Sequence, residues 1–205
     1  MVKVKNCGIT NVRDARAAVR LGADALGFNF YRHSPRCVAR ERARAIMASL
    51  PPFITGVGVF VNESADVILE TCEAAGLHVV QLHGDETPTF VDSLRRIARI
   101  KAFRIRDERD LKSLPRYRAE AYLLDAYTPD RRGGTGATFN WEIARAAQPY
   151  GPIILAGGLT PDNVADAVRQ VKPFAVDVAS GVESSPGAKD RGLMEAFIRN
   201  AKCAL

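Results

Sequence analysis

The sequence predicts an α/β protein in which eight parallel strands alternate with helices and close into a (β/α)8 barrel, the TIM barrel. Two observations favour this fold. Short apolar or β-branched runs recur along all 205 residues, and each is followed by a longer segment with helical spacing. No Gly-x-Gly-x-x-Gly motif follows the first run, whereas an open sheet that binds a dinucleotide would place one there. An open doubly wound sheet has the same alternation and is the competing architecture.

Eight runs are expected to form the strands, and they are mostly apolar because parallel strands are buried on both faces. They span Val2–Cys7, Ala25–Phe30, Ile54–Phe60, His78–His83, Ile100–Ile105, Ala121–Asp125, Ile153–Ala156 and Phe174–Val178. The two longest intervals between strand ends follow the second and the sixth run. Because barrel enzymes build their sites from the loops after the strands, these insertions place function at one end of the barrel.

Four helix starts are marked by a residue whose side-chain oxygen can cap the first turn, namely Asn11, Ser64, Thr87 and Thr160. Proline follows the last two of these, at the first helical position, where its missing N–H costs least. The helices that begin after Asn11 and Ser64 are expected to end at Gly22 and Gly76.

The composition indicates one domain over residues 1–205. Hydrophobic residues make up 47% of the chain and charged residues 25%, which suits a single buried core and not a disordered chain. No run approaches the roughly 20 apolar residues of a membrane-spanning helix, and no signal-peptide pattern begins the chain. We therefore expect a cytoplasmic protein with no membrane partner.

The net charge of +6 suits an anionic partner. The arginines recur on predicted helical segments, in the groups Arg13, Arg16 and Arg20, then Arg40, Arg42 and Arg44, then Arg95, Arg96 and Arg99. They lack the interleaved aromatic residues of a surface that stacks nucleic-acid bases. We interpret them as solvated helix faces and expect no nucleic-acid partner.

Neither a metal site nor a disulfide framework is predicted. The cysteines Cys7, Cys37, Cys72 and Cys203 are scattered and form no C-x-x-C pair, so free thiols are expected. The histidines His33, His78 and His83 lack the spacing of metal ligands.

Two glycine-containing segments near the C-terminus form the strongest local signal. Gly157 and Gly158 follow the seventh predicted strand, and Ser180 and Gly181 follow the eighth. Glycine lets backbone N–H groups approach a phosphate closely, and a short helix after the eighth strand would add donors. Barrel enzymes commonly bind phosphate at this place, although such glycines can also serve only to make tight turns. We expect a phosphate-binding site here.

Cys7 and Asp125 end the first and the sixth predicted strand, so their side chains are expected at the same rim. A thiolate can act as a general base where nearby positive charge lowers the pKa of the thiol, and a carboxyl group can donate a proton. Position alone favours a buried structural thiol for Cys7. The structural alternative for Asp125 is to cap a loop or to pair with Arg131 or Arg132.

Three further residues are candidates for binding a ligand. Asp177, one residue before the end of the eighth strand, can bind a substrate hydroxyl or a backbone amide. Arg36, in the long loop after the second strand, can hold a substrate carboxylate with two parallel hydrogen bonds or stay solvated. His83, at the end of the fourth strand, can line the mouth of the barrel.

Taken together, six motifs resemble the phosphoribosylanthranilate isomerases of tryptophan biosynthesis in kind and in order, over the whole chain. They are Lys5–Thr10 (KNCGIT), Ser34–Arg36, Gln81–Gly84, Gly133–Gly136, Ala156–Leu159 and Asp177–Glu183. Two positions depart from the family pattern, because Asn6 replaces a residue that is usually apolar and Ala179 replaces a common serine. Asn6 brings a polar side chain next to Cys7 in sequence, where a hydrogen bond between the two would depend on the strand register.

The resemblance implies a cofactor-independent isomerase, monomeric or homodimeric, that acts on a small molecule. The reaction it implies is the Amadori rearrangement of N-(5-phosphoribosyl)anthranilate to 1-(2-carboxyphenylamino)-1-deoxyribulose 5-phosphate. The matched positions make Cys7 the general base at sugar C2 and Asp125 the general acid at the ring oxygen. Arg36 would hold the anthranilate carboxylate and Asp177 a sugar hydroxyl, with His83 beside them. The amides of Gly157, Gly158, Ser180 and Gly181 would hold the phosphate.

Two other functions stay open at this stage. A dual-substrate barrel isomerase would also act on a histidine-pathway intermediate, and that type is expected to have aspartate in place of Cys7. A non-catalytic barrel would bind a sugar phosphate without isomerising it.

Overall fold

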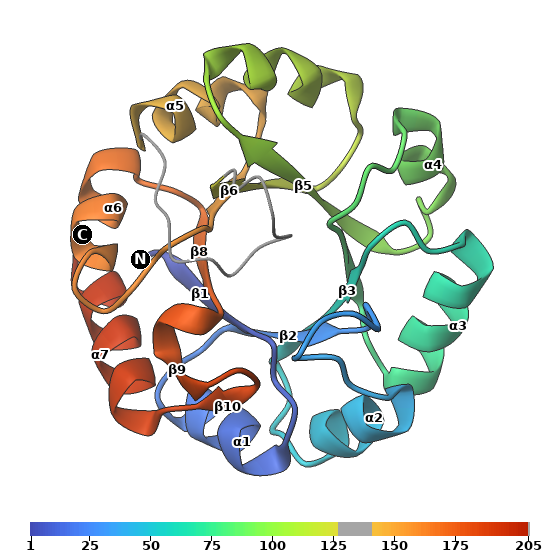
Figure 1. Cartoon of the computed structure of the whole chain (residues 1–205), viewed down its shortest axis with the longest axis vertical. Helices are drawn as coiled ribbons and strands as arrows, with labels where there is room; N and C mark the ends of the chain where they lie inside the picture. Colours follow the sequence, from blue (N-terminus) through green and yellow to red (C-terminus); the bar gives the residue numbers. More distant parts are fainter. Residues whose placement is uncertain (127–140, 205) are drawn as a thin grey trace.

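Eight parallel strands form one closed barrel in the computed structural model, which describes residues 1–126 and 141–204. Each strand pairs with its neighbours in sequence, and β1 pairs with β8 to complete the ring (Figure 1). The strands are β1 (Lys3–Cys7), β2 (Ala25–Asn29), β3 (Thr55–Phe60), β4 (Val79–Leu82), β5 (Ala98–Ile105), β6 (Ala121–Ala126), β7 (Ile153–Leu155) and β8 (Ala175–Val178). Every expected strand is present, with its ends within two residues of the predicted ones. Closure confirms the barrel and excludes the open doubly wound sheet.

Helices surround the strands as an outer ring (Figure 1). The α-helices are α1 (Val12–Arg20), α2 (Arg40–Ala48), α3 (Ala65–Ala75), α4 (Pro88–Ser93), α5 (Trp141–Ala146), α6 (Val164–Val171) and α7 (Arg191–Lys202). The other described elements are the 3-10 helices η1 (Glu108–Arg116), η2 (Gln148–Tyr150) and η3 (Ser180–Val182), and a small hairpin of β9 (Glu183–Ser185) and β10 (Ala188–Lys189). None of the helices in the described ranges is long and apolar enough to cross a membrane.

Three of the four predicted helix starts are confirmed by their capping hydrogen bonds. The side chains of Asn11, Ser64 and Thr87 each accept a hydrogen bond from the backbone N–H three residues later, and α1, α3 and α4 begin directly after them. Pro88 takes the first position of α4, as expected. The cap of α3 at Gly76 is left-handed, with φ of 68°.

The helix start predicted at Thr160 is wrong, because α6 begins only at Val164. The carboxamide of Asn163 explains the delay. Its Oδ1 accepts a hydrogen bond from the Thr160 N–H at 2.8 Å, and its Nδ2 donates to the Gly158 carbonyl at 2.9 Å. Asn163 therefore binds the preceding loop and stabilises a turn where the sequence indicated the first turn of a helix.

Arg99 also departs from prediction, because it is not part of a solvated helix face. It lies on β5 and is buried. Its guanidinium pairs with Glu120, with 2.7 Å between Nη2 and Oε1. The remaining two arginines of that predicted group, Arg95 and Arg96, are exposed.

Apolar residues form two separate clusters, one on each side of the barrel wall. The larger one packs the strands against the helices and includes Leu26, Phe28 and Leu124. The smaller one fills the inside of the barrel and includes Leu123 and Ile154. Adjacent residues on one strand belong to different clusters because successive strand side chains point to opposite faces. The barrel is thus a packed core.

Candidate active site

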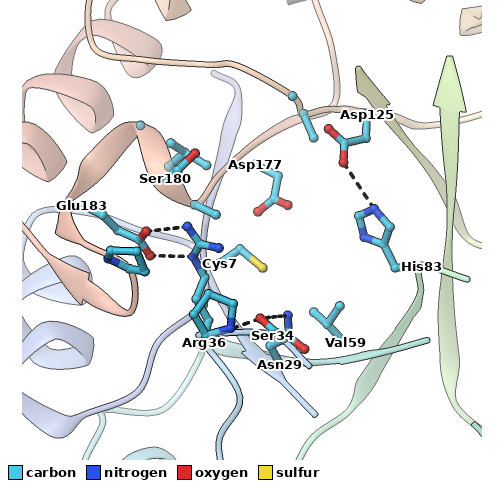
Figure 2. A pocket seen from close by; sticks show the side chains of 18 of the residues that line it. Cys7, Asn29, Ser34, Arg36, Val59, His83, Asp125, Asp177, Ser180 and Glu183 are labelled. Carbon is cyan, nitrogen blue, oxygen red and sulfur yellow. Dashed lines mark hydrogen bonds and ion pairs between the residues drawn. The ribbon is translucent and has the colours of Figure 1, made fainter. Parts of the chain in front are cut away.

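A cavity of about 940 Å³ opens at the C-terminal ends of the strands. All the predicted site residues line it, namely Cys7, Arg36, His83, Asp125, Gly157, Gly158, Asp177, Ser180 and Gly181. Figure 2 shows their side chains converging from several walls, with Asp125 and His83 on one side and Arg36 with Glu183 on the other. The fold therefore brings together residues that lie far apart in the sequence.

Cys7 lies at the end of β1 and is buried, with its sulfur directed toward the cavity (Figure 2). Its register partner on β2 is Gly27, where an added Cβ would lie only 2.7 Å from the Cys7 sulfur. Glycine at that position therefore makes the space for the thiol. Burial raises the pKa of the Cys7 thiol, while the ammonium groups of Lys5 and Lys189 act in the opposite direction.

Lys5 and Asp177 form a buried ion pair beside Cys7. Their Nζ and Oδ1 atoms are 2.9 Å apart, and β1 and β8 place the two residues at the same register position. Lys5 also donates to Gln81 Oε1 at 2.9 Å, and it shares a face of β1 with Cys7, two residues along the strand. Although burial lowers the pKa of Lys5, Asp177 and Cys7 together raise it above its usual value. Lys5 is therefore held as an ammonium ion.

Asp125 faces the cavity from β6, on a different wall from Cys7. Its Oδ2 lies 3.3 Å from Nε2 of His83, and the other ring nitrogen of His83 lies 2.9 Å from Nε2 of Gln81. The carboxyl group is thus buried beside an imidazole in the cavity wall. The expected alternative partners Arg131 and Arg132, and the motif Gly133–Gly136, lie outside the described residues.

Arg36 projects into the cavity but is already paired with a carboxylate of the chain. Its Nε and Nη2 donate to the two oxygens of Glu183 at 2.8 and 2.6 Å. Glu183 also accepts from Lys189 Nζ at 2.9 Å, and these two cations hold its pKa below the usual value although burial opposes the shift. The Arg36 side chain lies over Gly8, where an added Cβ would be 2.5 Å from its Cδ. The edge of the guanidinium that carries Nε and Nη2 is therefore engaged by Glu183.

The two glycine-containing loops after β7 and β8 lie against each other. Gly157 and Gly158 have φ values of 78° and 66°, a backbone conformation that favours glycine. An added Cβ at Gly181 would lie 2.0 Å from the carbonyl oxygen of Leu159, so only glycine permits this approach of the two loops. The 3-10 helix η3, which begins at Ser180, matches the short helix expected after the eighth strand.

Lys5, Gln81, Glu183 and Lys189 were not identified as site residues from the sequence. Lys5 had a usable signal, because residues two apart on a strand share a face and Lys5 therefore points the same way as Cys7. A charged residue inside a buried strand also needs a partner. Glu183 had no comparable signal, since its pairing with Arg36 depends on two loops that are remote in sequence.

Asn6 points away from the cavity, so no hydrogen bond joins it to Cys7. It is fully buried, and its register partners Leu26 and Val178 belong to the apolar cluster between strands and helices. Neither its Oδ1 nor its Nδ2 has a hydrogen-bond partner in the described ranges.

One polar cavity of this closed (β/α)8 barrel contains a buried thiol, two carboxyl groups and two glycine turns. These features define a barrel enzyme with its site at the C-terminal ends of the strands. The sequence model of the N-(5'phosphoribosyl)anthranilate (PRA) isomerase family matches residues 4–200. The chain belongs to this family and is an isomerase.

Individual relatives agree over full length. The chain is 56% identical over 202 residues to the N-(5'-phosphoribosyl)anthranilate isomerase of Geobacter sulfurreducens, covering 98% of this chain and 99% of that one. It is 54% identical to the enzyme of Trichlorobacter lovleyi, with 100% of both chains covered. The crystal structure of the Thermotoga maritima phosphoribosyl anthranilate isomerase superposes with a TM-score of 0.94 at 46% identity, covering 98% and 99% of the two chains. A phosphoribosyl anthranilate isomerase in complex with reduced 1-(o-carboxyphenylamino)-1-deoxyribulose 5-phosphate gives a TM-score of 0.90 at 44% identity, with the same coverage.

Proposed function

We propose that this chain converts N-(5-phosphoribosyl)anthranilate to 1-(2-carboxyphenylamino)-1-deoxyribulose 5-phosphate in tryptophan biosynthesis, without a cofactor. Family membership supports the activity, and a relative whose structure holds the reduced product supports the substrate. The observation that carries the mechanism is that Cys7 and Asp125 face one cavity from β1 and β6. A sugar between them would meet a base and an acid from different sides.

The two ends of the substrate are held by different parts of the cavity. The backbone amides around Gly157, Gly158, Ser180 and Gly181 bind the phosphate, since glycine leaves the N–H groups open to an anion. The Nη1 end of Arg36 binds the anthranilate carboxylate, because Glu183 occupies only the Nε edge of the guanidinium. Asp177 accepts a hydrogen bond from a sugar hydroxyl, and His83 lines the wall between the two ends. Fixing both ends keeps the sugar carbons near the reacting groups.

Proton transfer opens the ring and then moves the double bond. The Asp125 carboxyl group donates a proton to the ring oxygen, the bond from C1 to that oxygen breaks, and an iminium forms between C1 and the anthranilate nitrogen. The iminium acidifies the proton on C2, and the Cys7 thiolate removes it. The C2–H electron pair becomes the C1=C2 bond of an enolamine, and the iminium π pair returns to nitrogen. The enolamine then takes a proton at C1, and the C2 hydroxyl loses its proton to give the ketone.

The test is consumption of freshly generated phosphoribosylanthranilate, followed by its fluorescence, with purified protein. We expect Cys7→Ser and Asp125→Asn each to lower kcat by about 10²–10⁴-fold, the range for loss of a general base or acid. Binding of the reduced product should change little in both, because neither residue holds the phosphate or the carboxylate.

Cys72→Ala is the matched control, since Cys72 is a buried thiol on α3 outside the cavity. It should keep wild-type turnover. Unchanged kcat in Cys7→Ser would exclude Cys7 as the base. Product binding without isomerisation by the wild-type chain would establish a non-catalytic barrel, and comparable turnover of the histidine-pathway substrate would establish a dual-substrate enzyme.

We also infer that residues 1–205 form one catalytic domain and that the enzyme works in the cytoplasm, where phosphorylated metabolites are retained. In solution we expect a monomer or a homodimer, and the dimeric phosphoribosylanthranilate isomerase of Thermotoga maritima supports the homodimer. Sedimentation velocity at micromolar concentration distinguishes the two masses.

A further inference from the structure

We propose that Lys5 is a positioning residue whose ammonium group stabilises the thiolate form of Cys7. The inference deepens the proposed function, since it matters for catalysis only if Cys7 is the base. It rests on two features of the site, which are the contacts of Lys5 and the charge balance of the groups around the sulfur.

The contacts of Lys5 fix the position of its ammonium group. Its Nζ donates to Asp177 Oδ1 and to Gln81 Oε1, each at 2.9 Å, and its side chain lies on the same face of β1 as that of Cys7, two residues along the strand. An ammonium group has three donors, and these two acceptors take two of them. Only 4% of the Lys5 side chain is exposed, and water therefore screens its charge little. The ion acts on the sulfur at short range.

The charges around Cys7 balance when it is a thiolate. Five titratable groups either act on the Cys7 sulfur or form an ion pair with a group that acts on it. They are the cations Lys5, Lys189 and Arg36 and the carboxylates Asp177 and Glu183. Three cations face two carboxylates, so a neutral thiol would leave one buried positive charge without a counter-ion. Burial has the largest effect and raises the pKa of the Cys7 thiol above its usual value, and the charge of Lys5 is the strongest influence that opposes this shift.

Lys5 is the cation best placed to supply that charge. Glu183 binds both Arg36 and Lys189 directly, at 2.6 and 2.9 Å, so much of their field is already neutralised. Lys5 is neutralised by Asp177 in a similar way, but it shares a face of β1 with Cys7, two residues along the strand, and its charge lowers the Cys7 pKa more than that of Lys189 does. Removing Lys5 is therefore expected to affect Cys7 more than removing either of the others.

The experiment measures the thiolate directly and needs no substrate. In a background of Cys37→Ser, Cys72→Ala and Cys203→Ser, the absorbance of Cys7 thiolate near 240 nm is titrated against pH, with Cys7→Ala subtracted. Lys5→Met should raise the apparent pKa of Cys7 by about one to three units, the effect of removing an adjacent opposite charge. Asp177→Asn should shift it in the opposite direction, because a nearby negative charge is lost.

Lys5→Met alone leaves Asp177 buried without its partner and can unfold the chain. The double variant Lys5→Met/Asp177→Asn removes both charges, and its titration is compared with that of Asp177→Asn. A higher Cys7 pKa in the double variant supports the proposal, whereas equal titrations overturn it. Lys101→Met/Glu86→Gln is the matched control, because this equally buried lysine–carboxylate pair lies outside the cavity, and the double variant should leave the titration unchanged.

The activity profile separates this proposal from the proposed function. In the double variant, the acid limb of the kcat/KM profile should shift to higher pH than in Asp177→Asn, together with the thiolate titration. A thiolate shift without any movement of that limb would reject Cys7 as the base while leaving the role of Lys5 toward the sulfur intact.

A second inference follows from the other hydrogen bond of Lys5. Because Lys5 can only donate, Gln81 Oε1 must face it, and Gln81 Nε2 must donate to Nδ1 of His83, 2.9 Å away. We infer that neutral His83 carries its proton on Nε2, the nitrogen that lies 3.3 Å from Asp125. Gln81 thereby turns the Nε2–H of His83 toward Asp125, to which it makes no hydrogen bond in this structure, and this N–H would stabilise the Asp125 carboxylate left after proton donation.

Nitrogen-15 NMR of histidine-labelled protein at pH 8 tests this tautomer, with the His83 signals assigned by their loss in His83→Asn. We expect the Nδ1 signal of an unprotonated nitrogen in the wild type. Gln81→Glu presents an acceptor to Nδ1 and should reverse the tautomer. Protonated Nδ1 in the wild type would overturn the inference.

Discussion

Two buried lysines of the barrel make almost the same ion pair and lie in different settings. Lys5 on β1 is 2.9 Å from Asp177, and Lys101 on β5 is 2.8 Å from Glu86. All four side chains are at least nine-tenths buried. The first pair reaches the cavity through Asp177, and its Lys5 shares a strand face with Cys7, whereas neither member of the second pair lines the cavity.

The second pair binds the loop that follows β4. Lys101 donates to the carbonyls of Leu82 and Gly84, and Glu86 accepts from the backbone N–H groups of Asn62 and Gly84. Burial lowers the pKa of Lys101, although Glu86 opposes the shift, while the pKa of Lys5 is raised. With the role proposed for Lys5, the same type of ion pair acts on a reactive thiol in one setting, and in the other it fixes a loop through contacts with the backbone.

Lys101→Met should give the largest loss of stability. It leaves Glu86 buried without its cation, and breaking one partner of a buried pair costs about 3–5 kcal/mol. Urea unfolding followed by circular dichroism measures the change. Turnover per folded molecule should stay near wild type, because the pair does not touch the cavity.

The double variant Lys101→Met/Glu86→Gln is the control for that prediction. It removes both charges, so it should recover most of the loss, while the carboxamide that replaces the Glu86 carboxylate keeps an oxygen for one backbone N–H. Loss of turnover in proportion to loss of stability would erase the distinction between the two lysines.

Glu183→Gln tests a third buried lysine, Lys189, whose side chain is fully buried against Glu183. Hydrogen bonds to a charged group contribute about 1.5–3 kcal/mol each, and we expect a loss of this order at pH 7. The pKa of Glu183 is lowered in the folded state, so its stabilisation is present above pH 4.5 and is lost as the pH falls through the folded value. The free energies of unfolding of variant and wild type should therefore converge as the pH falls below 4.5. A gap that stays constant with pH would show that the loss is one of packing.

The strands and the first helix caps could be predicted from the sequence because their causes are local. Apolar runs of strand length report burial on both faces, and Asn11, Ser64 and Thr87 each cap a turn three residues ahead. The helix start predicted at Thr160 was wrong because an equally local group, the Asn163 side chain, accepts a hydrogen bond from the Thr160 backbone N–H. The sequence does not decide between two such local interactions when contacts with a neighbouring loop also shape the segment.

The positions of the site residues could be predicted, and their partners could not. Strand ends placed Cys7 and Asp125 at one rim, since parallel strands end on the same side of a barrel. The pairing of Lys5 with Asp177 depends on closure of β1 onto β8, across 172 residues of sequence. The pairing of Arg36 with Glu183 joins two loops 147 residues apart. No periodicity within either segment contains that information.

Asn6 offers the smallest test, because it shares β1 with Lys5 but is a buried polar residue without a partner in the described part of the chain. Its unbonded amide costs desolvation free energy, and asparagine is also unfavourable in strands. Asn6→Val should therefore raise the free energy of unfolding by about 1 kcal/mol. The urea midpoint measures this gain, and kcat/KM should not change because the side chain points away from the cavity. Asn6→Asp is the opposite control, since a lone buried carboxylate should destabilise strongly. If Asn6→Val destabilised the protein instead, the amide would have to be satisfied in solution, and the contrast between the two faces of β1 would lie in side-chain shape and not in hydrogen bonding.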